Sequence, residues 1–303
     1  MFTILTDTSA NLDCALLREL DIGVIPFSFT VDGEEQSCTD TAAFDGKAFY
    51  DAMRAGKRVT TSQITPQRYV DAFRPLLAAG RKVLFVGMSS GISGSYDSAR
   101  MARLQLLEEY PMARLALVDT LGASLGEGLL VLRAAELRDR GASLEEAENT
   151  LLALRRGMKQ IFTVEDLKYL RATGRLSNFK AVMATVLNIK PLLRGDAAGR
   201  IICFAKVRGR KKSIEALAER YEAMVREAGN QTVGIAHADC PEDAALLADL
   251  LRRRFPPREI MTVCYEPVTG SHVGPGTLAL FFFGTEAEKV PEPAPRHSPA
   301  RAV

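Results

Sequence analysis

Residues 87–91, Gly-Met-Ser-Ser-Gly, follow an apolar run and match the G-x-S-x-G pattern in which a hydrolase presents a nucleophilic serine. In that interpretation Ser89 attacks an acyl ester. Asp119 and His272 follow it in the chain, in the Ser…Asp…His order of a catalytic triad. The first question is therefore whether a serine of this turn attacks a substrate or whether the turn only binds one.

The length of the turn argues against attack. A nucleophile elbow needs its helix to begin almost directly after the serine, because the tight strand–turn–helix exposes the hydroxyl. Here helical spacing begins only at Ser95, and Gly91 and Gly94 disfavour an earlier start. A serine hydrolase acting at Ser89 is therefore the alternative hypothesis and not the leading one.

The same residues can form a cradle for an anion. Gly91 and Gly94 allow exposed backbone N–H groups, Ser90, Ser93 and Ser95 add hydroxyls, and the following helix begins with a partial positive charge. Such a site suits a carboxylate or a phosphate. Three further stretches of similar composition are predicted between strands and helices, at the carboxyl edge of a parallel sheet: TDTSAN (6–11), TTSQIT (60–65) and DTLGASLGEG (119–128).

Two other kinds of stretch carry polar chemistry. His272 lies in GSHVGPG (270–276), which we interpret as a glycine-rich loop that could hold the ring rigidly against an anion. The basic stretches LRATGR (170–175) and KVRGRKK (206–212) are solvated faces or docking surfaces for an acidic or phosphorylated partner. The chain has no P-loop and no G-x-G-x-x-G pattern, so a phosphate- or nucleotide-binding regulator is the third hypothesis.

The elements that must position these residues alternate between strands and helices in the first half. This alternation predicts a largely parallel sheet covered on both faces. The helix over 65–80 has Thr65 as its cap, and the helix over 143–157 begins with Ser143 and Glu146 at capping-box spacing. The other predicted strands are 2–5, 24–33, 82–88 and 113–120, and the other helices are 13–20, 95–110 and a long one through 129–140 that ends at Gly141.

The pattern changes after residue 160. Residues 191–207 read as two strands around a Gly-Asp turn, which predicts a hairpin and a mixed sheet. We therefore predict an α/β protein with two domains, 1–158 and 159–285, and a disordered proline-rich tail over 286–303. Further strands are predicted at 160–164, 231–238, 259–267 and 276–284, and helices at 166–174, 177–189, 210–229 and 241–255.

The bulk composition narrows the function classes. The 303 residues include 39 basic and 37 acidic side chains, so no global charge favours nucleic acid. Five cysteines without C-x-x-C spacing and only three histidines predict reduced thiols and no metal site. No uncharged apolar run reaches the roughly 18 residues of a membrane span, and the start does not resemble a signal peptide. We expect a cytoplasmic protein.

Taken in order along the chain, these motifs resemble those of the DegV family of bacterial fatty-acid-binding proteins. The resemblance covers about residues 3–284. It implies two α/β domains with a lipid in the cleft between them. The motifs that carry it are TDTSANL, TTSQITP, SSGISGSYDSA, VDTLGASLGEGLLVLRAA, YLRATGRLS, KPLLRG, KVRGRKK and GSHVGPG.

The resemblance also implies which residues bind the lipid. Thr61, Ser93 and His272 would hold the carboxylate of a long-chain fatty acid. The neighbours Ser62, Gly94 and Ser95 would make secondary contacts, and Arg171 and Arg175 would contact a partner or a phosphate.

By the same resemblance the chain is a carrier and not an enzyme, with no cofactor of its own. A separate ATP-dependent kinase subunit would phosphorylate the bound fatty acid to an acyl phosphate, for use in phospholipid metabolism. Exchange of the lipid would involve transient contact with a membrane. The chemistry of these residues agrees with carboxylate binding, because hydroxyls, a histidine and helix-end N–H groups can hold a buried carboxylate without a permanent countercharge.

Overall fold

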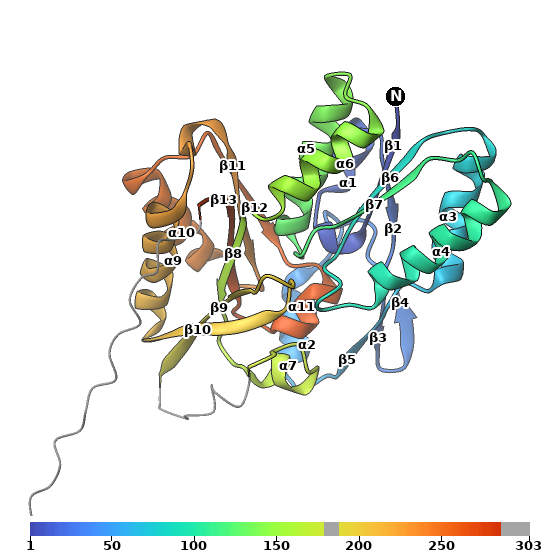
Figure 1. The fold of residues 1–303 in the computed structure, drawn as a ribbon. Helices are drawn as coiled ribbons and strands as arrows, with labels where there is room; N and C mark the ends of the chain where they lie inside the picture. Colours follow the sequence, from blue (N-terminus) through green and yellow to red (C-terminus); the bar gives the residue numbers. More distant parts are fainter. Residues whose placement is uncertain (179–187, 286–303) are drawn as a thin grey trace, which may run out of the picture.

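The structure is a computed structural model that describes residues 1–178 and 188–285 (Figure 1). The predicted tail over 286–303 lies outside the described residues. So does most of the helix predicted over 177–189.

The first sheet consists of four parallel strands in the order β2-β1-β6-β7. All five residues of β6 and of β7 are buried, as expected for strands that are covered on both faces. The parallel sheet predicted for the first half is thus confirmed. Its strands are β1 (Thr3–Asp7), β2 (Ile22–Ile25), β6 (Val83–Gly87) and β7 (Leu115–Asp119).

Two helices of this half begin at the caps that the sequence predicts, whereas the helix over Gly46–Arg54 was not predicted. Thr65 caps α3 by accepting a hydrogen bond from the Arg68 N–H, and Ser143 and Glu146 form the predicted capping box of α6. The helices are α1 (Cys14–Glu19), α2 (Gly46–Arg54), α3 (Pro66–Ala78), α4 (Ser95–Glu109), α5 (Leu125–Asp139) and α6 (Leu144–Leu154), with a short 3₁₀ helix η1 (Thr8–Ala10).

A small antiparallel sheet was not predicted. It has the order β4-β3-β5 and consists of β3 (Ser28–Val31), β4 (Glu34–Gln36) and β5 (Val59–Ser62). The single strand predicted over 24–33 is therefore wrong: Pro26 has no N–H for a sheet ladder, and the chain leaves the parallel sheet there. The TTSQIT stretch is also misplaced by the prediction, because Thr61 pairs with Phe29 in this sheet and not at the parallel edge.

The second large sheet has six strands in the order β10-β9-β8-β13-β11-β12. Strands β11 and β12 run parallel, and the other neighbours run antiparallel, including the predicted β9–β10 hairpin. The mixed sheet is confirmed. Its strands are β8 (Met158–Thr163), β9 (Ile189–Gly195), β10 (Ile201–Arg208), β11 (Thr232–His237), β12 (Glu259–Cys264) and β13 (Leu278–Phe283).

Helices cover the two large sheets in layers (Figure 1). Helices α3 and α4 lie outside the four-stranded sheet, and α5 and α6 lie between the two sheets, where α5 contacts strands of both. Helices α9 and α10 cover the far side of the six-stranded sheet. The elements of this half are α7 (Lys168–Ala172), α9 (Arg210–Met224), α10 (Pro241–Arg254), α11 (Pro267–Val273) and the 3₁₀ helix η2 (Ala228–Asn230).

Helix α11 corrects the prediction for GSHVGPG. His272 lies in the last turn of this helix and not in a loop. The buried Glu266 begins the helix by accepting hydrogen bonds from the N–H groups of Val268 and Thr269, and Pro267 fits its first turn. Gly274, at φ 82°, ends it.

Helix α11 also joins the two halves of the chain, since it packs against α2, β3 and β5. Asn11 accepts from the Glu266 N–H at 2.7 Å and donates to the Cys264 carbonyl at 2.9 Å. The Tyr50 hydroxyl donates to the Tyr265 carbonyl at 2.8 Å. These bonds fix the start of α11, and with it His272, against the first half.

The close approach of α2 and α11 gives a test of this packing. A side chain on Gly270 would overlap the Tyr50 hydroxyl, whereas a side chain on Gly229 would meet open space. Gly270→Ala should therefore lower the free energy of unfolding by about 1–3 kcal/mol, although alanine is the better helix former by about 1 kcal/mol. Gly229→Ala should change it by less than about 0.5 kcal/mol. Urea denaturation followed by circular dichroism measures both, and an unchanged or more stable Gly270→Ala would contradict this packing.

Candidate functional site

The main candidate site is a cavity of about 290 Å³ lined by residues of both halves of the chain. Its walls come from the turns after β6 and β7, from β5, from the inner face of the six-stranded sheet and from α11. Most of the lining surface is apolar, and its larger apolar side chains are Phe27, Met88, Ile92, Leu121, Phe162, Ile201, Val268, Val273 and Phe281. An apolar cavity with a few polar groups on its wall is the usual form of a small-molecule site.

Thr61 and His272 meet on the wall of this cavity. The Thr61 Oγ1 atom lies 2.8 Å from His272 Nε2, which joins β5 to α11. The sequence placed these two residues in the same site although 211 positions separate them, and the structure brings them together.

The His272 ring is neutral at physiological pH. Burial lowers the pKa of His272 to about 4, and the positive charge of Arg175 lowers it as well. The Nδ1 atom is buried and has no hydrogen-bond partner among the described residues. Without a positive charge, His272 can donate one hydrogen bond from one ring nitrogen and accept one at the other.

Ser93 also lines the cavity, in the turn before α4. Its Oγ atom accepts from the Ser95 N–H at 3.2 Å and lies 3.0 Å from the Ser95 Oγ. Ser62 and Gly94 line the cavity too, whereas Ser95 does not. Ser95 is buried and accepts from the Ile64 N–H at 3.0 Å, so it ties the β5 end to the start of α4.

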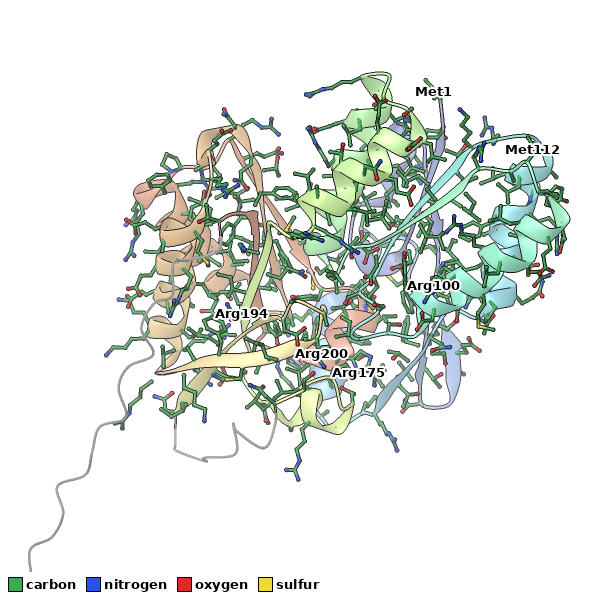
Figure 2. The ribbon with its side chains drawn as sticks, viewed as in Figure 1. Met1, Arg100, Met112, Arg175, Arg194 and Arg200 are labelled. Carbon is green, nitrogen blue, oxygen red and sulfur yellow. The ribbon has the colours of Figure 1, made fainter. Side chains whose placement is uncertain are left out.

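The two arginines that were predicted to contact a partner or a phosphate, Arg171 and Arg175, differ in their position relative to the cavity. Arg175 lines the cavity, and its Nη1 atom donates to the Thr173 carbonyl at 2.5 Å. Arg171 is exposed and does not line it. Leu176 and Ile201 pair in an isolated parallel β-bridge, so the residues that precede them, Arg175 and Arg200, lie close together. Figure 2 shows both arginines on the side of the molecule where α7 and β10 lie.

The turn after β1, TDTSAN, does not reach the cavity. Its Asp7 side chain is buried, accepts from Ser9 through both N–H and hydroxyl, and accepts from the Met88 N–H at 3.1 Å. The Ser9 hydroxyl also lies 2.5 Å from the buried Glu127, and burial raises the pKa of Glu127 well above its usual range. One hydroxyl hydrogen cannot serve both carboxyl contacts, so the pair retains a proton. This network fixes the turn that leads to Ser93.

The hydrolase alternative does not fit this geometry. Ser89 is fully buried and does not line the cavity, and its hydroxyl donates to the Gly199 carbonyl at 3.0 Å. Asp119 accepts from Ser90 and from the Leu121 N–H, and His272 pairs with Thr61. The three candidate triad residues thus have separate partners, and the G-x-S-x-G match has a structural explanation.

Sequence reasoning missed several lining residues. Ser124, Gln160, Tyr265 and Thr269 line the same cavity, and the Ser124 and Thr269 hydroxyls have no partner within the described ranges. The DTLGASLGEG stretch, which includes Ser124, was noted for its composition, but no single residue in it was chosen. Nothing in the sequence near Tyr265 or Thr269 marks them.

Residues 1–178 and 188–285 also bear on metal binding and on membrane insertion. In those ranges no three His, Cys, Asp or Glu side chains are grouped as a metal ion would require. None of the helices described there combines the length and the apolar character of a membrane span.

The cavity therefore suits a ligand with a long apolar part and one compact polar or anionic end. The apolar walls favour the apolar part of the ligand, and the neutral side chains of Thr61, Ser93 and His272 favour its polar or anionic end.

Comparison with known proteins identifies relatives along nearly the whole chain. The model of a family described as "Uncharacterised protein, DegV family" matches residues 1–285. A DegV domain-containing protein from Clostridium perfringens is 38% identical over 287 residues, which cover 95% of this chain and 99% of that protein. A second, from Streptococcus pyogenes, is 34% identical over 283 residues, covering 93% and 98%.

Solved structures with the same fold are described as lipid-binding. A DegV family protein from Thermus thermophilus, described by its fatty acid binding, superposes with a TM-score of 0.84 at 29% identity, covering 93% of this chain and 99% of that one. A DegV lipid-binding protein from Thermotoga maritima gives 0.81 at 28% identity, covering 95% and 100%. DegV from Bacillus subtilis, described as a fatty acid binding protein, gives 0.79 at 27% identity, covering 92% and 98%.

The buried, neutral state of His272 predicts a pH dependence. Its folded-state pKa, about 4, lies below the usual 6.5, so its contribution to stability is present above pH 6.5 and is lost as the pH falls towards 4. Without ligand, the free energy of unfolding should fall by on the order of 3 kcal/mol more between pH 6.5 and 4 in the wild type than in His272→Gln.

Nuclear magnetic resonance titration of the imidazole protons, with the His272 signal identified by its absence from His272→Gln, measures the same property directly. A His272 pKa near 6.5 would contradict the assignment of a buried, neutral ring.

Proposed function

Because this chain belongs to the DegV family, we propose that it binds a long-chain fatty acid in the cavity between its two large sheets. The observation that carries the proposal is the contact of Thr61 with His272 on the wall of a largely apolar cavity that Ser93 also lines. The fatty acid binding named for the relatives from Thermus thermophilus and Bacillus subtilis supports it.

The carboxylate of the ligand is held by the Thr61 and Ser93 hydroxyls, and His272 completes this head-group site by orienting Thr61. When His272 Nε2–H donates to Thr61 Oγ1, the Thr61 hydrogen is free to donate to a carboxylate oxygen. In the same way, when the Ser95 hydroxyl donates to Ser93, the Ser93 hydrogen becomes free. Ser62 and Gly94 contribute secondary contacts beside them.

The acyl chain lies along the apolar walls. Each CH₂ group removed from water contributes about 0.8 kcal/mol, so a long chain supplies most of the affinity. The head-group donors then offset the cost of removing the carboxylate from water and fix which end of the ligand reaches them.

The chain acts as a carrier whose ligand is used by a separate kinase subunit. A carboxylate oxygen of the bound fatty acid forms a bond to the γ-phosphorus of ATP, the bond from that phosphorus to the β,γ-bridging oxygen breaks, and acyl phosphate and ADP result. Arg175, at the cavity, and Arg171, on the surface, would contact the kinase or the phosphate. The product enters phospholipid metabolism in the cytoplasm, with transient membrane contact when lipid is exchanged.

We further propose that residues 1–158 and 159–285 are the two domains. The sheets support this division, since β1 to β7 lie before its boundary and β9 to β13 after it, with β8 beginning at Met158. The cavity takes lining residues from both sides.

Fatty acid binding and its head-group contacts are tested together. The purified protein should release a long-chain fatty acid on lipid extraction, and Thr61→Val and Ser93→Ala should each raise its Kd by about 10-fold or more, because each removes a hydrogen bond to a charge. Thr60→Val is the matched control: Thr60 is exposed, does not line the cavity and points to the other face of β5. Absence of any bound or titratable fatty acid would refute the proposal, and equal loss of affinity in Thr60→Val would refute the head-group assignment.

Presentation to a kinase is tested by trapping the product. Protein loaded with a labelled fatty acid, incubated with ATP and extract of the source cells, should yield the labelled hydroxamate when hydroxylamine is added. Arg171→Ala should lower the yield with little change in fatty acid Kd, since Arg171 does not line the cavity. The same yield from free fatty acid without the protein would contradict a carrier role.

A further inference from the structure

The cavity wall carries a second group of hydroxyls besides those of the head-group site. Ser124 is 1% exposed, Tyr265 3% and Thr269 9%, and all three line the cavity. The hydroxyls of Ser124 and Thr269 have no hydrogen-bond partner in the part of the chain that the structure describes. A buried hydroxyl without a partner is costly, so each of these groups needs an oxygen or nitrogen atom from a ligand or a water.

Ser124 is held in a conformation that its own helix does not explain. It is the N-cap residue of α5, yet its side chain makes no capping hydrogen bond. Its backbone has φ 53° and ψ −139°, a sparsely populated region that costs free energy in a non-glycine residue. Strain of this kind with an unused hydroxyl points to a role at the cavity and not in the fold.

Tyr265 and Thr269 are fixed by hydrogen bonds of their backbone groups. The Tyr265 N–H donates to the His237 carbonyl at 2.8 Å, and its carbonyl accepts from Tyr50. The Thr269 N–H donates to the buried Glu266 carboxyl at 2.6 Å. Burial raises the pKa of the Tyr265 phenol, which therefore stays a neutral donor.

Ser124 and Tyr265 belong to other parts of the wall than Thr61 and Ser93, whereas Thr269 lies on α11, about one turn before His272. Ser124 follows β7 and Tyr265 follows β12, whereas Thr61 lies on β5 and Ser93 follows β6. Their hydroxyls make no hydrogen bond to either donor. Since the head-group donors suffice for one carboxylate, a plain acyl chain would leave the second group facing methylenes.

We propose that Ser124, Tyr265 and Thr269 form an inner polar subsite that selects fatty acids with a hydroxyl group on the acyl chain. This inference rests on the proposed fatty acid binding and names the class of ligand more closely. A chain hydroxyl can accept a hydrogen bond from one of these groups, so it pairs a hydroxyl that a saturated chain leaves unpaired. With an unsubstituted chain, an ordered water would occupy the subsite.

The test compares octadecanoate with a series of monohydroxyoctadecanoates that differ in the position of the hydroxyl. Competition with a fluorescent fatty acid on the lipid-free, full-length protein gives each Kd. At least one hydroxylated acid should bind about fivefold more tightly than octadecanoate, as one or two net hydrogen bonds imply.

Ser124→Ala and Tyr265→Phe should each reduce that preference to less than about twofold. The preference is the ratio of two Kd values for the same variant, so a change in affinity that is common to all the acids cancels. Tyr110→Phe, at a tyrosine that does not line the cavity, is the matched control and should keep the preference. Thermal unfolding should show both cavity variants folded, and Ser124→Ala at least as stable as the wild type, because it removes an unpartnered buried hydroxyl.

The outcomes separate the two proposals. If octadecanoate binds and no hydroxylated acid binds more tightly, the subsite holds only water and this inference is wrong, while the proposed function stands. A preference that survives both cavity substitutions also refutes the inference. If neither octadecanoate nor any hydroxylated acid binds, the proposed function fails with it.

Discussion

A hydrogen bond between two neutral side chains, Thr61 and His272, is the contact on which the candidate site depends. It joins a small antiparallel sheet from the first half of the chain to a seven-residue helix from the second half, at the wall of an apolar cavity. Because both side chains are uncharged, the cavity without a ligand avoids the cost of a buried, unpaired ion. The same pair can still direct hydrogens to an anion that arrives with its own apolar chain.

Buried carboxyl groups hold this pair in place from both sides. Glu266 begins α11, and its N–H bonds to Asn11, so the helix carrying His272 is fixed against the first half. Burial raises the pKa of Glu266 to about 7 despite the N–H groups that it accepts from. On the other side, Asp7 accepts from the Met88 N–H and fixes the turn that ends in Ser93. The charged and protonated groups therefore support the site from outside it, and the cavity wall itself remains largely neutral.

Local signals in the sequence predicted the layers well. The caps at Thr65 and Ser143, the buried β6 and β7 and the β9–β10 hairpin each follow from a few neighbouring residues. Helix α11 was missed because Gly270 and the glycines after it are typical of a loop, whereas here Gly270 admits the Tyr50 hydroxyl. The sheet that holds Thr61 could not be predicted either, since the pairing of β5 with β3 depends on residues about 30 positions apart.

The site shows the same division between local and long-range information. Thr61, Ser93 and His272 were identified through the resemblance of whole motifs to a family and not through spacing. Ser124 and Thr269 could not be found in that way, because a hydroxyl without a partner is a property of the folded wall. A crystal structure of the protein with octadecanoate tests the central claim most directly. Our account predicts a carboxylate oxygen within about 3 Å of both Thr61 Oγ1 and Ser93 Oγ; a carboxylate at Ser124 and Tyr265, with the methyl end at Thr61, would contradict it.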